Sequence, residues 1–154
     1  MASTEPTDMQ LREIAEADQE FSFDMINLIK YRPTAIYESA ADNAIGRSGR
    51  EAYQEYGMVA FPKIIGMGGS LVYKGTCEHQ FVGDESQNYD DLIIVRYPSR
   101  RAYLEMFNSV EYQQAIKHRI AGLEYRVLHD TNVMLPNYLR TVATQFDPRI
   151  HSKG

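Results

Sequence analysis

Cysteine is nearly absent from this sequence, whose 154 residues include only Cys77. A single thiol forms no disulfide within the chain and cannot supply a cysteine zinc site. A chain without disulfides suits a reducing compartment, so we expect a cytoplasmic location. The sequence also lacks a basic run, and its net charge is −5. We expect no nucleic-acid partner, because nucleic acids are held by clustered positive charge.

Long apolar segments are missing as well. No apolar stretch approaches the roughly 18 residues that a membrane-spanning helix needs. The beginning of the chain, MASTEPTDMQLREIAEADQE, is acidic and polar and lacks the apolar segment of a signal peptide. These two absences predict a protein with no membrane partner.

Motifs that hold metals or cofactors are absent too. The sequence contains no HxxxH, HExxH or CxxC pattern, so no dedicated metal site is expected. The segment GMGGS lacks GxGxxG spacing and follows a predicted helix, which indicates a turn and not a dinucleotide-binding loop. There is no GxSxG elbow, and nothing supports a haem ligand. We expect no bound cofactor.

The segments that remain alternate between strand and helix periodicity. Predicted strands cover residues 21–32, 69–77, 89–98 and 126–134, and predicted helices cover 48–61, 100–107 and 110–125. Strand, helix, strand, strand, helix, strand is the split βαβ order of a ferredoxin-like α+β domain. The predicted organisation is an N-terminal helical extension at 1–20, the domain at 21–134 and a C-terminal tail at 135–154.

Local signals mark the ends of the predicted helices and irregularities between them. Thr7 and Gln10 have capping-box spacing ahead of a short N-terminal helix. Pro62 is predicted to kink or end the helix at 48–61, and Gly75 is predicted to mark a bulge. The segment between Pro33 and Gly46 is predicted to be a loop. Three serines are predicted N-caps of the other helices: Ser48, Ser99 and Ser109.

The first and third strands are apolar on both faces. In the first, one face carries Phe23, Met25, Asn27, Ile29 and Tyr31, and the other carries Ile26 and Leu28. Helices cover one face of such a sheet, and water on the other face would favour polar residues there. We therefore predict that a second copy covers that face, giving a homodimeric α/β barrel with a cavity between the two sheets. The alternative is that the N-terminal helix and the tail cover it within one chain.

Four segments resemble the DUF1330 group of dimeric α/β barrel proteins: INLIKYRPTAIY, SGREAYQEY, GMGGSLVYKG and YDDLIIVRYPSRRAYLEMFNSVEYQQAIKHR. The likeness spans about Asp24 to Val133 and is sharpest from Leu92 through Arg119. It implies the same dimeric fold. The wider superfamily includes cofactor-free monooxygenases, lactone isomerases, polyketide cyclases and haem enzymes, whereas DUF1330 itself has no assigned function. The resemblance therefore implies a fold and no particular reaction.

Arg119 is the most informative candidate for a binding residue. At 100° per residue it falls near the middle of the apolar stripe of its predicted helix, about 20° from Tyr112. A guanidinium aimed at a core needs an anion or carbonyl oxygens around it. Arg119 either binds an anionic ligand oxygen, snorkels, or forms a structural pair within the chain. The candidate partners for such a pair are Asp90, Asp91 and Glu124.

Two other polar groups are candidates for orienting a ligand. Asn27 is the polar residue on an otherwise apolar strand face, so its amide either orients a ligand carbonyl or bonds a neighbouring backbone. Tyr112 either points its hydroxyl into a cavity as a donor or weak acid, or packs in the core with a satisfied hydroxyl. Tyr53 and Tyr56 are weaker candidates, because aromatic residues at helical spacing are usually core residues.

Two histidines are candidates for moving a proton near neutral pH. His118 precedes Arg119 but lies about 120° from the middle of the apolar stripe, which places it at the rim. His129 alternates with Val127 on the same face of the last strand and reaches the predicted cavity. For each histidine, a structural role is the alternative.

These residues support a leading hypothesis and two others. The leading one is a cofactor-free isomerase, cyclase, lyase or monooxygenase that acts in the barrel cavity on a small apolar or aromatic substrate. Arg119 and Asn27 would bind the anionic or carbonyl oxygen, and Tyr112, His118 and His129 would be catalytic. The alternatives are a non-catalytic small-molecule binding or sensor protein and an assembly module with a packed interior.

Overall fold

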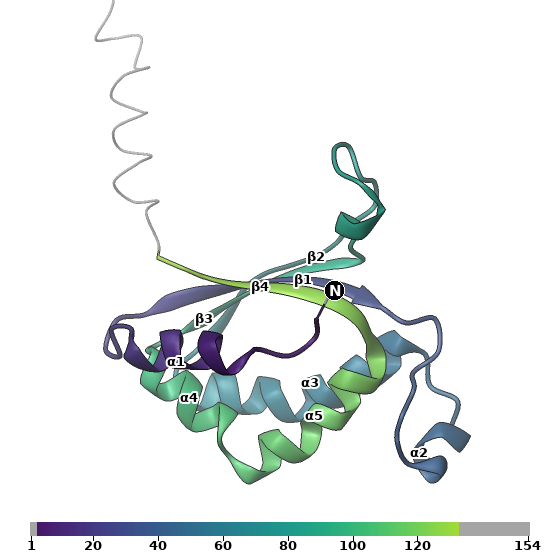
Figure 1. Ribbon diagram of the computed structural model, residues 1–154. Coiled ribbons are helices and arrows are strands. Elements are labelled where there is room, and N and C mark those ends of the chain that lie inside the picture. The colour runs from purple at the N-terminus through teal and green to yellow at the C-terminus, as the bar shows by residue number, and fades with distance from the viewer. Residues whose placement is uncertain (1–2, 133–154) are drawn as a thin grey trace, which may run out of the picture.

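The computed structural model describes residues 3–132, which form one antiparallel sheet with α-helices on one side (Figure 1). The strand order is β2-β3-β1-β4. This order, with helices between β1 and β2 and between β3 and β4, confirms the ferredoxin-like α+β fold. The elements of the fold are β1 Phe23–Tyr31, α3 Gly49–Gly66, β2 Ser70–Thr76, β3 Asp91–Tyr97, α4 Arg100–Phe107, α5 Val110–Gly122 and β4 Leu123–Thr131. Three further elements are α1 Asp8–Glu16, α2 Ala40–Ala44 and a 3-10 helix at Glu85–Gln87.

Most of the predicted helix starts are confirmed by side-chain caps. Thr7 and Gln10 form the capping box of α1, and Ser48 forms one at α3. Ser99 accepts a hydrogen bond from a backbone amide in the first turn of α4. Ser109 occupies the N-cap position of α5, but its hydroxyl donates to the Met106 carbonyl oxygen and does not cap.

Two local predictions are wrong: that Pro62 ends its helix, and that the segment before α3 is a loop throughout. The alternative effect of Pro62, a kink in the helix, stays a prediction. Pro62 does not end the helix, which continues to Gly66. A proline removes one helical hydrogen bond, but Ala60 and Ile64 are buried on either side of it, and their packing offsets that loss. The segment predicted as a loop contains the short helix α2, capped by the hydroxyl of Ser39.

The predicted bulge is also displaced. The register of β2 on β3 shifts between Leu71 and Tyr73, not at Gly75. A Cβ on Gly75 would lie 2.5 Å from the hydroxyl oxygen of the exposed Tyr73 side chain. The glycine therefore leaves room for the Tyr73 ring on the same edge strand.

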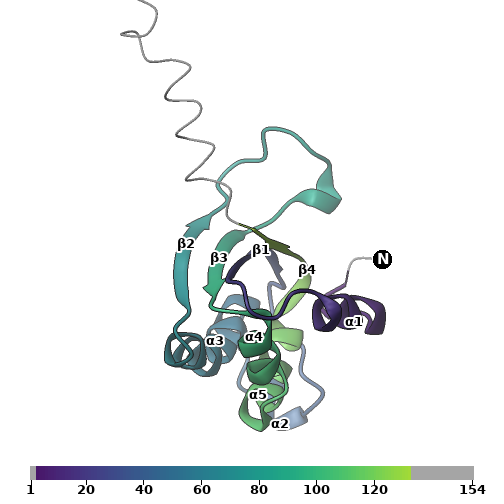
Figure 2. The same ribbon diagram turned by 90° about the vertical axis from the view of Figure 1, so that its left-hand side faces the viewer.

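The sheet has one covered face and one open face (Figure 2). The core lies between the covered face of the sheet and helices α3, α4 and α5. Its buried residues are Phe23, Met25, Ile29, Tyr31, Ala60, Ile64, Ile93, Val95, Tyr97, Tyr103, Met106, Tyr112, Ile116 and Leu123. The open face carries a group of partly exposed apolar residues, here called the open apolar strip: Ile26, Leu28, Leu92, Ile94 and Val127. The predicted apolar character of both faces of β1 and β3 is confirmed.

The N-terminal helix does not cover the open face. Helix α1 lies on the helix side of the sheet, next to α4, and has no buried residue (Figures 1 and 2). This half of the single-chain alternative is therefore wrong. The predicted tail at 135–154 lies outside the described residues.

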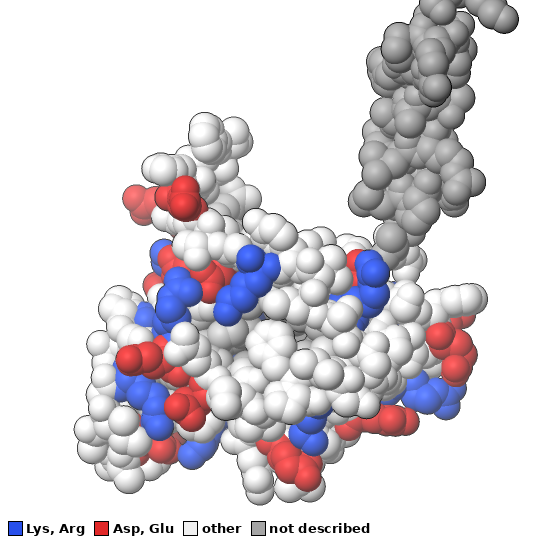
Figure 3. Space-filling model, turned by 180° about the vertical axis from the view of Figure 1, so that it is seen from behind, with Lys and Arg blue, Asp and Glu red and all other residues white. Residues whose placement is uncertain are grey.

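Charges of both signs are interspersed on the surface shown in Figure 3. No field of one sign gathers on that side of the molecule. Among the described residues, no helix is long and apolar enough to cross a membrane.

Two glycines allow α3 and α5 to approach each other closely at the end of β1. The Gly49 amide donates to the Arg32 carbonyl oxygen at 3.1 Å, and the Arg32 amide donates to the Gly122 carbonyl oxygen at 2.9 Å. A Cβ on Gly49 would lie 2.3 Å from the Arg32 oxygen and 2.4 Å from the Gly122 oxygen. This junction fixes the C-terminal end of α5, one turn beyond Arg119.

We predict that Gly49→Ala lowers the free energy of unfolding by at least about 2 kcal/mol, because the methyl group forces packed backbone atoms apart. Urea denaturation measures this change. The control is Gly66→Ala at the end of the same helix, where a Cβ meets nothing within 4 Å. That change is expected to shift stability by less than about 1 kcal/mol. Equal effects of the two substitutions would contradict the close junction.

Candidate functional site

Arg119 lies between the helices and the covered face of the sheet, as its position on the helical stripe predicts. It is on α5 and is 1% exposed. Its neighbours on α5, Tyr112, Ala115 and Ile116, are buried on the same side. A charged group at this depth is stable only when other groups replace its lost hydration.

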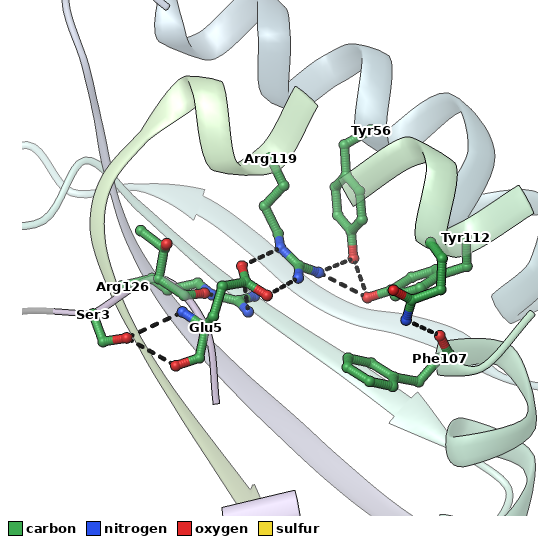
Figure 4. A network of polar contacts seen from close by, with 9 residues as sticks. Ser3, Glu5, Tyr56, Phe107, Tyr112, Arg119 and Arg126 are labelled. Atoms are coloured by element: carbon green, nitrogen blue, oxygen red, sulfur yellow. Dashed lines mark hydrogen bonds and ion pairs between the residues drawn. The ribbon is translucent and has the colours of Figure 1, made fainter. Parts of the chain in front are cut away.

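Two tyrosine hydroxyls supply part of that replacement. The Arg119 Nη1 donates to the Tyr112 hydroxyl oxygen at 2.9 Å and to the Tyr56 hydroxyl oxygen at 3.3 Å. The two hydroxyl oxygens are 2.7 Å apart and share a further hydrogen bond. The guanidinium also lies 5.0 Å from the centre of the Tyr56 ring, within range of a cation–π interaction. Tyr56 of α3 and Tyr112 of α5 thus hold one side of the guanidinium (Figure 4).

The charge of Arg119 is balanced by Glu5, from the segment before α1. The Arg119 Nη2 donates to Glu5 Oε2 at 2.7 Å, and its Nε donates to Oε1 at 3.3 Å. Both carboxylate oxygens therefore face the guanidinium, in the two-point geometry that arginine favours for carboxylates (Figure 4). An ion pair with a carboxylate of the chain is one of the three roles predicted for Arg119.

The predicted partners of that pair are wrong. The Asp90 carboxylate accepts from Lys30 Nζ at 3.0 Å, and Asp91 accepts from Arg50 Nη1 at 2.7 Å. Glu124 is exposed.

A second arginine adjoins the same carboxylate. Arg126 projects from the covered face of β4, and its Nη2 lies 3.8 Å from Glu5 Oε1. Its Nε donates to the Thr4 carbonyl oxygen, and its backbone amide donates to the Ser3 carbonyl oxygen at 3.2 Å. Two guanidinium groups therefore share one carboxylate, which leaves this region with one excess positive charge.

The pKa directions follow from burial and from these neighbours. Burial raises the pKa of Tyr112 well above its ordinary value, and the nearby Tyr56 adds to the rise, so the hydroxyl keeps its proton near neutral pH. Burial disfavours the charge of Arg119, yet Tyr112, Tyr56 and Glu5 outweigh it and its pKa is raised. Burial lowers the pKa of Arg126, and the charge of Arg119 lowers it further.

Asn27 lies on the covered face, where its amide is already bonded. The Nδ2 donates to the Met25 and Ile93 carbonyl oxygens, each at 3.2 Å. Backbone bonding is one of the two roles predicted for this residue. Because its face packs against the helices, Asn27 does not face a chamber between two sheets, which corrects the barrel-cavity hypothesis for this residue.

The side chains of the two histidines do not bond to the Arg119 guanidinium or to each other. The His118 Nδ1 is 2.8 Å from the Tyr37 hydroxyl oxygen, and burial, followed by the charges of Lys117 and Arg47, lowers the pKa of His118. His129 is exposed on the open face of the sheet, where it pairs with Ile26. Of the five predicted site residues, the structure brings only Arg119 and Tyr112 into contact.

A second buried polar cluster lies at the far end of β1 and β3. Asp91 is 1% exposed, and its Oδ2 accepts from the Tyr31 hydroxyl at 2.7 Å as well as from Arg50. The other oxygen, Oδ1, is buried and has no hydrogen-bond partner among the described residues. Within residues 3–132, no group of three or more His, Cys, Asp or Glu side chains is placed to hold a metal ion.

These contacts are formed by a domain with identifiable relatives. The sequence pattern of the family described as Domain of unknown function (DUF1330) matches residues 45–129, more than half of the chain. The chain belongs to the DUF1330 family. The matched residues include Tyr56, Tyr112, Arg119 and Arg126, whereas Glu5 lies outside them.

Two crystal structures of one protein resemble this DUF1330 chain in both sequence and fold. That protein is RPA0582 of Rhodopseudomonas palustris, described as a protein of unknown function. Both structures are 30% identical to this chain with a TM-score of 0.79, and the match covers 88% of this chain. It covers 97% of the methylated RPA0582 chain and 100% of the other. No curated protein matches this chain.

Two residues beside Arg119, Arg126 and Glu5, are not among the candidates predicted from the sequence. Strand alternation from Leu128 is the signal that places Arg126 on the covered face. No local signal identifies Glu5, because it is 114 residues from its partner Arg119. Its position depends on the path of the segment before α1.

We predict that Tyr112→Phe lowers the free energy of unfolding by about 1–2 kcal/mol, because it removes one hydrogen bond from a buried charge and another from Tyr56. Urea denaturation is the measurement. The control is Tyr125→Phe, which removes an exposed hydroxyl that donates to the Asn88 carbonyl oxygen. It is expected to cost less than about 0.5 kcal/mol. A cost for Tyr112→Phe no larger than that of the control would contradict this arrangement.

Proposed function

We propose that this protein binds a small apolar or aromatic molecule through an anionic or carbonyl oxygen at Arg119. The observation that supports this most is the Arg119 guanidinium, which is 1% exposed and donates to the hydroxyls of Tyr56 and Tyr112. A second arginine, Arg126, faces the same Glu5 carboxylate. Such a set attracts an anion and offers hydrogen bonds to its oxygens. The rings of Tyr56, Tyr112 and Phe107 are suited to an apolar or aromatic body.

The proposed ligand site lies within one protomer. Arg119 and Tyr112 are on the covered side of the sheet, whereas a chamber between two sheets would be lined by the open face. A ligand at Arg119 would therefore enter between the sheet and the helix layer. This differs from the location that the sequence suggests.

Binding without catalysis is the function that the geometry supports best. An isomerase, cyclase, lyase or oxygenase without a cofactor needs a group that moves a proton as well as an oxygen anchor. Among the described residues, no histidine side chain bonds to the Arg119 guanidinium, and Tyr112 retains its proton near neutral pH. A carrier or sensor needs the anchor alone. Catalysis at this site remains the second proposal, with Tyr112 as hydrogen-bond donor to the bound oxygen.

We predict that small aromatic carboxylates raise the melting temperature of the protein and that neutral amides of the same shape do not. Arg119→Lys keeps the charge but loses the planar fork, so the affinity should fall about tenfold or more. Arg101→Lys, at a position whose side chain is 62% exposed, is the control and should bind as the wild type does. Mass spectrometry of the recovered ligand distinguishes a binder, which returns it unchanged, from an enzyme.

Two results would count against the proposal. The first is that carboxylates and amides shift the melting temperature equally. The second is that Arg119→Lys retains wild-type affinity for every carboxylate that binds. Either result would show that the guanidinium is structural.

We also propose that the open face packs against the same face of a second copy. The supporting feature is the open apolar strip, which lies on the central strands β1 and β3 and continues onto β4. The described α-helices lie on the opposite face, whereas the β2–β3 loop with its 3-10 helix rises on the side of the open face (Figure 2). Burying this strip in a face-to-face sandwich removes its apolar surface from water.

We predict a solution mass of about 35 kDa, which is twice the 17.7 kDa of one chain. Light scattering after size-exclusion chromatography gives this mass directly. Ile94→Lys places a charge in the middle of the open apolar strip and should yield monomers. Met58→Lys, at a position 76% exposed on α3, should leave the mass unchanged. A wild-type mass of a single chain at micromolar concentration would refute the dimer.

A further inference from the structure

The carboxylate that balances Arg119 belongs to a segment at the edge of the fold. This segment, Ser3–Thr7, is here called the arm. The arm lies beside β4 and leads along the chain to the start of α1. It directs Glu5 inward to the two arginines (Figure 4). If Arg119 holds a ligand oxygen, as proposed above, then Glu5 already occupies that position. The inference below therefore rests on the proposed function.

Glu5 has the geometry of a bound carboxylate ligand. Its two oxygens meet the Nε and Nη2 of Arg119, and Oε1 also faces Arg126. A glutamate side chain ends in two methylene groups and a carboxylate, which is the chemistry of a propionate. Any free carboxylate with a short apolar stem can present the same group to Arg119.

The arm is attached to the domain by few contacts. Its Ser3 carbonyl oxygen accepts from the Arg126 amide, its Thr4 carbonyl oxygen accepts from the Arg126 side chain, and Glu5 makes the ion pair. Ser3 and Thr7 are exposed, and α1 beyond the arm has no buried residue. Ile14 of α1 packs against the core, but within the arm itself little apolar burial opposes withdrawal.

The charges favour exchange of one carboxylate for another. With Glu5 in place, Arg119 and Arg126 share one negative charge. Withdrawal of the arm without replacement would leave two positive charges in a region where the side chain of Arg119 is 1% and that of Arg126 9% exposed. That state is costly, so an open site favours an incoming anion. The receiving groups all lie at residues 45–129, the part of the chain that matches the DUF1330 pattern, whereas Glu5 lies outside it.

We propose that Glu5 is an internal competitor for a carboxylate site, and that a free monocarboxylate with a short apolar or aromatic stem displaces the arm from Arg119. The arm then sets the affinity of the site. When the binding-competent state is populated a tenth of the time or less, the apparent dissociation constant is raised about tenfold or more. Removing the Glu5 carboxylate removes this competition.

The test compares the affinity of full-length variants for 3-phenylpropionate by isothermal titration calorimetry, with 3-phenylpropionamide as the uncharged probe. Glu5→Ala is expected to bind the carboxylate at least about tenfold more tightly than the wild type. Glu16→Ala removes the same charge from the exposed end of α1 and is expected to match the wild type. The amide is expected to bind none of the three proteins measurably.

A second measurement uses the wild-type protein and does not depend on the folding of Glu5→Ala. The Arg126 amide donates to the Ser3 carbonyl oxygen, so its hydrogen exchange reports whether the arm is docked. Saturating 3-phenylpropionate is expected to accelerate exchange of this amide, and 3-phenylpropionamide is expected to leave it unchanged.

The outcomes separate this inference from the proposed function. Equal affinity of the wild type and Glu5→Ala for the carboxylate, with unchanged exchange at Arg126, would overturn the competitor role while leaving carboxylate binding intact. Absence of carboxylate binding to the wild type and to Glu5→Ala would overturn both. Tighter binding by Glu16→Ala as well as Glu5→Ala would assign the effect to net charge and would also overturn the competitor role.

Discussion

The burial of one positive charge organises the helix side of this molecule. Removing a guanidinium from water is costly, and the Arg119 group is stable where it lies because a carboxylate and two tyrosine hydroxyls bond to its nitrogens. These partners come from α3, α5 and the segment before α1. The charge therefore ties together three parts of the chain that are distant in sequence, and it gives the N-terminal extension a defined place on the domain.

The two faces of the sheet have different chemistry. The covered face carries the polar groups that are oriented by packing, including Asn27, Asp91 and Arg126. The open face carries the open apolar strip and His129. A ligand at Arg119 and a partner subunit on the open face would therefore use opposite sides of the same four strands. Strands β1 and β4 carry residues on both faces, so the same strands would form part of the ligand site and of the subunit contact.

Periodicity was sufficient to predict the ferredoxin-like order of elements and the inward direction of Arg119. Both depend on regular repeats of 2.0 and 3.6 residues along the chain. Periodicity also separated the face of Asn27 from that of Ile26, but it could not indicate which face the helices cover. That choice depends on the packing of the crossover helices, so the predicted residues fell on two sides of the sheet.

Contacts between distant segments account for what the sequence did not predict. Pro62 remains within α3 because Ala60 and Ile64 are buried beside it, a tertiary effect that outweighs a local preference. The pairing of Glu5 with Arg119 depends on the path of the chain before α1 and has no signature in composition or spacing. Asp90 and Asp91 are closer than Glu5 to Arg119 in the sequence, but they bond to Lys30 and Arg50 instead.

The most direct test of the buried charge is the exchange rate of the Arg119 Nε–H proton, measured by nitrogen-edited NMR of the arginine side chains. A guanidinium enclosed by Glu5, Tyr56 and Tyr112 should give one Nε–H signal that exchanges with water far more slowly than those of exposed arginines such as Arg101. Assignment of that signal to Arg119, by its loss in Arg119→Lys, would support the account. An Arg119 Nε–H that exchanges as fast as that of Arg101 would contradict it.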